Sequence, residues 1–213
     1  MSSSNENPTD YRYSDTEASH INTVLLPVIL KAISRLKPVR ILDLGCGNGY
    51  LANQIHQHFP NLSVYGLEPS REGVVLATAA FPKISLRQGS LYDPPPPDWC
   101  RTFDIVISTE VIEHLYRPAA LVEFATAVLK PEGSLLLSTP YHGYLKNLVL
   151  SIVNKWDFHF TALWDHGHIK FWSKRTLTLL LESHGYGFKS FVGVGRAPFL
   201  WKTMFLEFQQ LAK

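Results

Sequence analysis

Three glycines stand at alternate positions early in the chain, Gly45, Gly47 and Gly49, and Asp43 comes two residues before the first of them. The run before them is apolar and β-favouring, and the run after them favours a helix. A buried strand that turns through glycines into a helix brings bare backbone close to a ligand. The helix N-terminus adds unpaired N–H donors. The pattern therefore predicts a nucleotide-type cradle, with Asp43 available to a cationic or amine-bearing group.

A second acid, Glu68, follows the glycine turn by about twenty residues and ends the next apolar run. An acid at that place can accept both hydroxyls of a ribose, in NAD sites as in other nucleoside sites. The alternative is a solvated carboxylate at the end of a strand. The glycine turn upstream favours the ribose role.

A third group lies in the segment 109–115, Thr-Glu-Val-Ile-Glu-His-Leu. If this segment is helical, Glu110, Glu113 and His114 share one face. Two carboxylates and an imidazole can bind a divalent cation, and the oxygens favour Mg²⁺ or Mn²⁺. The competing interpretation is a loop after the fourth strand that binds no metal.

The segment 140–170 is rich in aromatic residues and contains four histidines, His142, His159, His166 and His168. Each could complete a metal site or act as general base toward an acceptor hydroxyl. For any one of them, a surface or packing role is the alternative. The candidate catalytic residues are Glu110, His114 and His142.

Strand-like and helix-like runs alternate along the chain, which predicts a parallel sheet covered by helices. We expect an N-terminal arm and helix over 1–36, with a capping box at Ser14 and Glu17, and one domain over 37–213. Weak periodicity over about 140–170 predicts a lid insertion. The expected strands are 39–43, 62–67, 84–88, 103–108, 134–138, 188–194 and roughly 201–208, with a turn at 131–133, and the last strand could equally be helical.

An acid before a Gly-x-Gly-x-Gly turn, together with Glu68 and the 110–115 segment, resembles the class I S-adenosylmethionine (SAM)-dependent methyltransferases. The resemblance covers about 41–213. It implies a doubly wound α/β fold with seven mostly parallel strands, an antiparallel last strand and SAM as cofactor. The family usually has an Asp where this chain has Ser90, so Ser90 and Leu91 are the expected adenine contacts. The implied cofactor contacts are Asp43, Gly45, Cys46, Gly47, Gly49, Tyr50, Glu68, Pro69, Ser90, Leu91, Thr109 and Glu110.

Segments like 110–115 occur in two groups that this chain resembles. In the ubiquinone-biosynthesis O-methyltransferases a metal would hold two phenolic oxygens, and in the small-RNA 3′-terminal 2′-O-methyltransferases it would hold a ribose diol. We expect Glu110, Glu113 and His114 to bind Mg²⁺ if a metal is used. The expected reaction is methyl transfer to oxygen of a small molecule. The alternatives are methylation of an RNA 3′ end, an NAD-dependent oxidoreductase and a non-catalytic SAM-binding module.

The composition is that of a globular protein, with 46% hydrophobic and 18% charged residues in 213. A net charge of +2 is too small to predict nucleic-acid binding. Two cysteines do not make a disulfide framework, and no run is long enough to span a membrane, so we expect a reducing, cytoplasmic location. The sequence leaves the oligomeric state open.

Overall fold

A computed structural model describes residues 13, 15–17, 20–160, 163 and 167–212. Ser14 of the expected capping box and His166 lie outside the described residues. The helices of the described part are α1 (His20–Leu36), α2 (Tyr50–His58), α3 (Arg71–Ala80), α4 (Ala119–Val128), α5 (Tyr144–Ile152), α6 (Trp156–Phe160) and α7 (Lys174–Glu182), with 3₁₀ turns η1 (Pro97–Trp99) and η2 (Ile112–His114).

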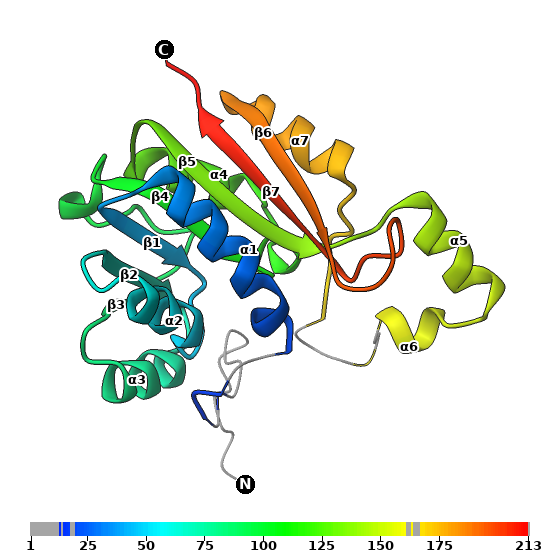
Figure 1. Cartoon of the computed structure of the whole chain (residues 1–213), viewed down its shortest axis with the longest axis horizontal. Coiled ribbons are helices and arrows are strands. Elements are labelled where there is room, and N and C mark those ends of the chain that lie inside the picture. Colours follow the sequence, from blue (N-terminus) through cyan, green and yellow to red (C-terminus); the bar gives the residue numbers. More distant parts are fainter. Residues whose placement is uncertain (1–12, 14, 18–19, 161–162, 164–166, 213) are drawn as a thin grey trace, which may run out of the picture.

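Seven strands form one sheet in the order β3-β2-β1-β4-β5-β7-β6. Only β7 among them runs antiparallel to its neighbours β5 and β6. This arrangement confirms the expected mostly parallel sheet with a reversed last strand (Figure 1). The strands are β1 (Arg40–Leu44), β2 (Ser63–Glu68), β3 (Ser85–Gln88), β4 (Phe103–Thr109), β5 (Leu129–Pro140), β6 (Tyr186–Val194) and β7 (Thr203–Gln210).

The two faces of the sheet carry separate apolar clusters. Along β1, Ile41 packs with α1 and α2 on one face, whereas Leu42 packs with α4 and α7 on the other. The same alternation appears in β4, where Ile105 and Val106 belong to opposite clusters. Strand side chains alternate between faces, so continuous apolar runs are what a sheet covered on both sides requires.

Local signals account for several element boundaries. The Ser70 hydroxyl accepts a hydrogen bond from the Gly73 N–H and caps α3, and Ser173 opens α7 through a capping box with Thr176. Strand β5 differs from expectation, because it begins at Leu129 and includes the segment predicted as a turn. Glu132 adopts φ 61° there, and the β4–β5 register shifts near Phe103, so a bulge takes up the irregularity.

The segment predicted as a lid insertion contains α5 and α6, which extend away from the sheet beyond the end of β5 (Figure 1). The chain then returns along 167–172 to α7. Helix α1 packs Leu25 and Ile29 into the same cluster as α2, so it contributes to the core of the fold. None of the helices in the described part of the chain is long and apolar enough to cross a membrane.

Candidate cofactor and acceptor site

The glycine turn joins the end of β1 to helix α2, which begins at Tyr50 as expected. Gly45, Gly47 and Gly49 have φ of 77°, 56° and 75°, a region that side-chain-bearing residues rarely adopt. The Gly45 N–H donates to the carbonyl of Leu67 at 2.8 Å and ties the turn to β2. A Cβ on Gly45 would lie 2.5 Å from a methyl carbon of Val111, so glycine is required there by space as well as by φ.

Two acids meet beside this turn, at the carboxyl ends of β1 and β2. The Glu68 carboxylate accepts the Gly47 N–H at 2.8 Å with Oε2 and the Ser70 N–H at 3.0 Å with Oε1. These bonds fix its orientation and leave each oxygen a second lone pair for a ligand hydroxyl. Glu68 is buried.

Asp43 is also buried, and its Oδ1 has no hydrogen-bond partner. Burial, and next the charge of Glu68, raise the pKa of Asp43 to about 7. Burial likewise raises the pKa of Glu68, while its two backbone hydrogen bonds oppose that shift. A buried acid with an unpartnered oxygen is costly in isolation, and a cationic ligand group would compensate it.

The N-terminal segment covers the glycine turn. The Asn48 amide donates to the carbonyls of Asp15 at 3.2 Å and Glu17 at 2.9 Å. A Cβ on Gly47 would lie 2.9 Å from the Tyr13 hydroxyl oxygen. The arm therefore packs directly on the backbone that was predicted to hold the cofactor.

The residues expected near the adenine lie in the loop after β3. The Gly89 N–H donates to the Glu68 carbonyl at 3.1 Å, and the Gln88 amide donates to the Pro69 carbonyl at 3.2 Å, so this loop is held against the end of β2. The Ser90 hydroxyl accepts the Tyr92 N–H at 3.1 Å, and Leu91 packs against the core. Contact of Ser90 and Leu91 with the cofactor stays a prediction.

The predicted helical face after β4 is wrong, because only Ile112–His114 forms a single 3₁₀ turn there. Thr109 is the last residue of β4, and Glu110 follows with φ 55°. The Glu110 carboxylate accepts hydrogen bonds from the hydroxyls of Ser138 at 2.8 Å and Thr203 at 2.6 Å. It therefore points toward β5 and β7, away from the direction that a helix would give it.

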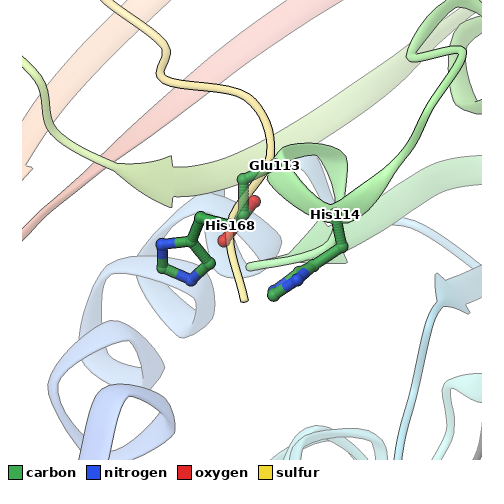
Figure 2. Close-up of side chains that lie close together, drawn as sticks. All are labelled: Glu113, His114 and His168. Atoms are coloured by element: carbon green, nitrogen blue, oxygen red, sulfur yellow. The ribbon is translucent and has the colours of Figure 1, made fainter. Parts of the chain in front are cut away.

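Glu113 and His114 instead meet His168, which lies on the return segment before α7 (Figure 2). One ligand atom of each of these three residues lies within 4.8 Å of the others. The Glu113 carbonyl accepts the N–H groups of Ile169 and Lys170 at 3.0 and 2.9 Å, which holds the return segment against the 3₁₀ turn.

The surroundings of this cluster orient its side chains. The Thr139 hydroxyl donates to Oε2 of Glu113 at 3.0 Å, while Oε1 is buried without a partner. Nδ1 of His114 lies 3.3 Å from the Gly167 carbonyl oxygen. Carbonyl and hydroxyl partners of this kind commonly fix the orientation of metal-binding imidazoles and carboxylates.

Burial sets the charges of the cluster. It raises the pKa of Glu113 well above its ordinary value, and the nearby charge of Glu110 adds to the shift. Burial lowers the pKa of His168 to about 4, which leaves the imidazole neutral and able to act as a ligand at neutral pH. A bound cation would compensate the buried Glu113 carboxylate, so the cluster fits a divalent metal ion.

A cavity of about 390 Å³ lies under α5 and α6, lined by His142, Asn147, Trp156, Asp157, Phe160 and Phe171. Phe160 stacks on the His142 ring with centroids 5.7 Å apart. Nε2 of His142 is buried without a hydrogen-bond partner, and burial lowers the pKa of this ring to about 4. His168 also contributes to that shift, which places the cavity near the Glu113 cluster.

Sequence reasoning missed the hydroxyls that orient the two glutamates and the buried Lys146 of α5. Ser138 and Thr139 form a polar pair after an apolar run, just before Pro140 ends β5, and that position in a parallel strand is a usable signal. Lys146 stands alone within an apolar stretch, and its ammonium donates to the Tyr141 carbonyl at 2.7 Å. No sequence pattern marked Thr203 as a partner of Glu110.

The sheet order and the two acids beside a glycine turn define a class I SAM-dependent methyltransferase. A nicotinamide dinucleotide domain has the order 3-2-1-4-5-6 and lacks the reversed strand inserted beside β5. The chain belongs to the family described as "Methyltransferase domain", whose family model matches residues 18–189.

Curated relatives and solved structures agree with this family. The mitochondrial ubiquinone biosynthesis O-methyltransferase of Bos taurus is 29% identical over 77% of this chain and 45% of that protein. A probable SAM-dependent methyltransferase of Mycolicibacterium smegmatis is 37% identical over 47% of this chain and 37% of that protein. This chain thus spans less than half the length of either.

Two solved structures share the fold at low sequence identity. The methyltransferase domain of bacterial CtHen1-C aligns with a TM-score of 0.70 at 21% identity, over 91% of this chain and all of that one. Magnesium protoporphyrin IX methyltransferase from Synechocystis, solved with bound SAH, aligns with a TM-score of 0.67 at 15% identity, over 93% and 90%.

The pKa of Asp43 leads to a prediction for SAM binding. The free protein holds Asp43 partly protonated at pH 7, whereas a bound ammonium group would favour the charged carboxylate. Binding then releases a proton, so affinity falls as pH falls below 7. We expect the SAM dissociation constant to rise about fivefold from pH 7 to pH 6. Calorimetry at both pH values measures this change, and Asp43→Asn should bind weakly with little pH dependence. Equal wild-type affinity at the two pH values would contradict the assignment.

Proposed function

We propose that this protein transfers the methyl group of SAM to one oxygen of a small molecule that carries two adjacent hydroxyl groups. The observation that carries the proposal is the Glu113, His114 and His168 cluster, which follows the end of β4 and lies near the cavity, because His168 acts on the cavity residue His142. A pair of neighbouring oxygens is a suitable bidentate ligand for a divalent ion held there. The name of the bovine relative also supports methylation at oxygen.

The cofactor would occupy the glycine turn. Asp43 would bind its ammonium group, Gly45 and Gly47 would present backbone to its methionine portion, and Glu68 would accept its ribose hydroxyls with the lone pairs left by its backbone bonds. Because the sulfonium already activates the methyl group, the protein mainly has to orient the acceptor oxygen in line and exclude water. The aromatic residues of the cavity, Trp156, Phe160 and Phe171, suit a flat apolar acceptor.

The metal would be held by Glu113, His114 and His168. A cation at this place lowers the pKa of a nearby hydroxyl. With two imidazoles and one carboxylate the donor set suits Mn²⁺ better than Mg²⁺, which prefers oxygen ligands. Glu110, expected from the sequence as a ligand with Glu113 and His114, is not one of these three residues; its carboxylate accepts hydrogen bonds from Ser138 and Thr203, and its role as a metal ligand stays a prediction.

His142 is the proposed general base. Its low pKa keeps the ring unprotonated but makes it a weak base. Proton removal from the acceptor therefore requires a hydroxyl group with a lowered pKa. The proposed cation would lower that pKa. His114, with one ring nitrogen near the Gly167 carbonyl, fits a ligand better than a base. The free thiols of Cys46 and Cys100 are compatible with the reducing cytoplasm expected from the sequence.

An acceptor panel tests the proposal. With labelled SAM and Mn²⁺, we expect catechol to be methylated at least about 100-fold faster than phenol or resorcinol, which lack the adjacent oxygen pair. An oligoribonucleotide with a free 3′-terminal diol serves as a second acceptor, because a ribose diol has the same paired oxygens. Transfer to the RNA alone would replace the small-molecule assignment. SAM binding without transfer to any acceptor would instead indicate a non-catalytic module.

A further inference from the structure

Helix α5 exposes apolar side chains and buries a charged one, which is the reverse of the distribution in the body of the protein. Its one buried residue is a lysine, Lys146, whose exposed fraction is 3%. Five of its six large apolar side chains are exposed, and their spacing of i, i+1, i+4, i+5 and i+8 places them on a single face. They are Tyr144, Leu145, Leu148, Val149 and Ile152.

The apolar face continues into α6, none of whose residues is buried. Val153 and Trp156 are about half exposed, at 50% and 44%, and Phe158 is 83% exposed. We call the exposed apolar side chains of 144–158 the α5–α6 surface. Protein surfaces rarely leave a contiguous apolar patch of this kind uncovered without an interaction to explain it.

Two exposed basic residues lie close to the α5–α6 surface, and the surrounding sequence has more basic than acidic residues. Residues 141–175 contain five Lys and Arg, of which Lys146 is buried, against two acids, Asp157 and Asp165. Lys155 lies between the two helices and is exposed, as is Arg196 in the β6–β7 loop, whose charge acts on Lys146. Figure 1 shows this loop beside α5. An apolar protein partner would not need basic residues beside the apolar side chains. Anionic lipid headgroups would be attracted by them.

From these features we propose that the α5–α6 surface docks on the surface of an anionic lipid bilayer. Leu148, Ile152 and Phe158 would enter the boundary between headgroups and acyl chains, Trp156 would lie at headgroup level, and Lys155 would contact phosphate. Helix α5 has nine residues, so it lies on the bilayer and does not cross it. The helices extend away from the sheet, which lets them reach the bilayer while the rest of the fold stays in water (Figure 1).

The docking goes beyond the proposed reaction and does not depend on it. None of the three metal-cluster residues belongs to the α5–α6 surface, and of the residues named for docking only Trp156 also lines the acceptor cavity. A failed acceptor panel would therefore leave the docking intact, and failed docking would leave the acceptor chemistry intact.

Vesicle co-sedimentation of the full chain tests the proposal. We expect binding to an equal mixture of phosphatidylcholine and phosphatidylglycerol to exceed binding to phosphatidylcholine alone by at least about tenfold. The double variant Leu148→Glu/Ile152→Glu should lower binding to the anionic vesicles by at least about tenfold, because two carboxylates would have to enter the interface. Lys155→Glu should weaken it less.

The matched control is Val75→Glu/Leu179→Glu, which places the same charges at exposed apolar positions of α3 and α7, and it should bind vesicles as the wild type does. Tryptophan emission should also shift to shorter wavelength with anionic vesicles, and Trp156→Phe should lose most of that shift. Circular dichroism and SAM affinity report whether each variant folds. Absence of vesicle binding, or equal binding by the Leu148→Glu/Ile152→Glu variant, would overturn the proposal. A third result would also overturn it: a wild-type protein that binds no vesicles and forms a dimer, which the Leu148→Glu/Ile152→Glu variant dissociates. A second copy of the chain would then cover the surface.

Discussion

Replacement of Glu113 by Gln should lower kcat for catechol methylation by about 100-fold or more, with SAM affinity nearly unchanged. The Glu113 carboxylate is fully buried, has one oxygen without a partner, and lies with two imidazoles close enough for one ion. The amide removes the negative charge that would hold the cation and leaves the His114 and His168 rings in place. Measurement of kcat at saturating SAM over a Mn²⁺ titration should show weakened metal dependence in the variant.

The metal assignment has a control and a decisive outcome. Glu123→Gln breaks an exposed ion pair with Arg117 on the surface of α4 and should leave kcat unchanged. His168→Gln should reproduce the Glu113→Gln defect, because it removes a ligand from a different segment of the chain. A wild-type protein that methylates catechol equally well with and without a chelator would rule out the metal.

Replacement of Glu68 by Gln should weaken SAM binding by about 100-fold. Both oxygens of this carboxylate accept backbone N–H groups, from Gly47 and Ser70, and both are expected to accept ribose hydroxyls. Glutamine has a single carbonyl oxygen, so its NH₂ group would face one of the two backbone N–H donors. The turn and the ribose site are therefore disturbed together, and calorimetry with SAM measures the loss.

A nearby acid separates this specific effect from a general change in charge. Glu72 is exposed and lies in the first turn of α3. The SAM dissociation constant of the Glu72→Gln variant should be within about twofold of the wild-type value. Thermal unfolding of the free protein shows whether Glu68→Gln still folds. SAM affinity in a folded Glu68→Gln protein equal to that of Glu72→Gln would contradict the ribose role.

Much of the fold could be predicted because its signals are local. The strand before Gly45, the glycine turn, the helix from Tyr50 and the cap at Ser173 each depend on a few neighbouring residues. The apolar character of β4 follows from burial on both faces, which a short stretch of sequence displays. The start of β5 was missed because a β-bulge takes up a segment that resembles a turn.

Part of the candidate site could likewise be predicted from local signals, and part could not. Asp43 and Glu68 could be placed together from sequence, since both lie at the carboxyl ends of neighbouring parallel strands, and in the structure the charge of Glu68 acts on Asp43. The 110–114 segment could not be interpreted correctly, because helical spacing assumes an α-helix. The chain instead forms one 3₁₀ turn, sends Glu110 toward Ser138 and Thr203, and brings Glu113 to His168.

The amino-acid pattern alone therefore predicts a SAM-type cradle and the sheet that carries it, because glycine conformation, strand burial and helix capping act over a few residues. The partner of Glu113, which lies 55 positions further along the chain, depends on how the return segment 167–172 crosses the end of β4. The outward apolar face of α5 depends on which side of that helix meets the body of the protein. Both are decided by packing between distant segments, for which no local residue pattern carries a signal.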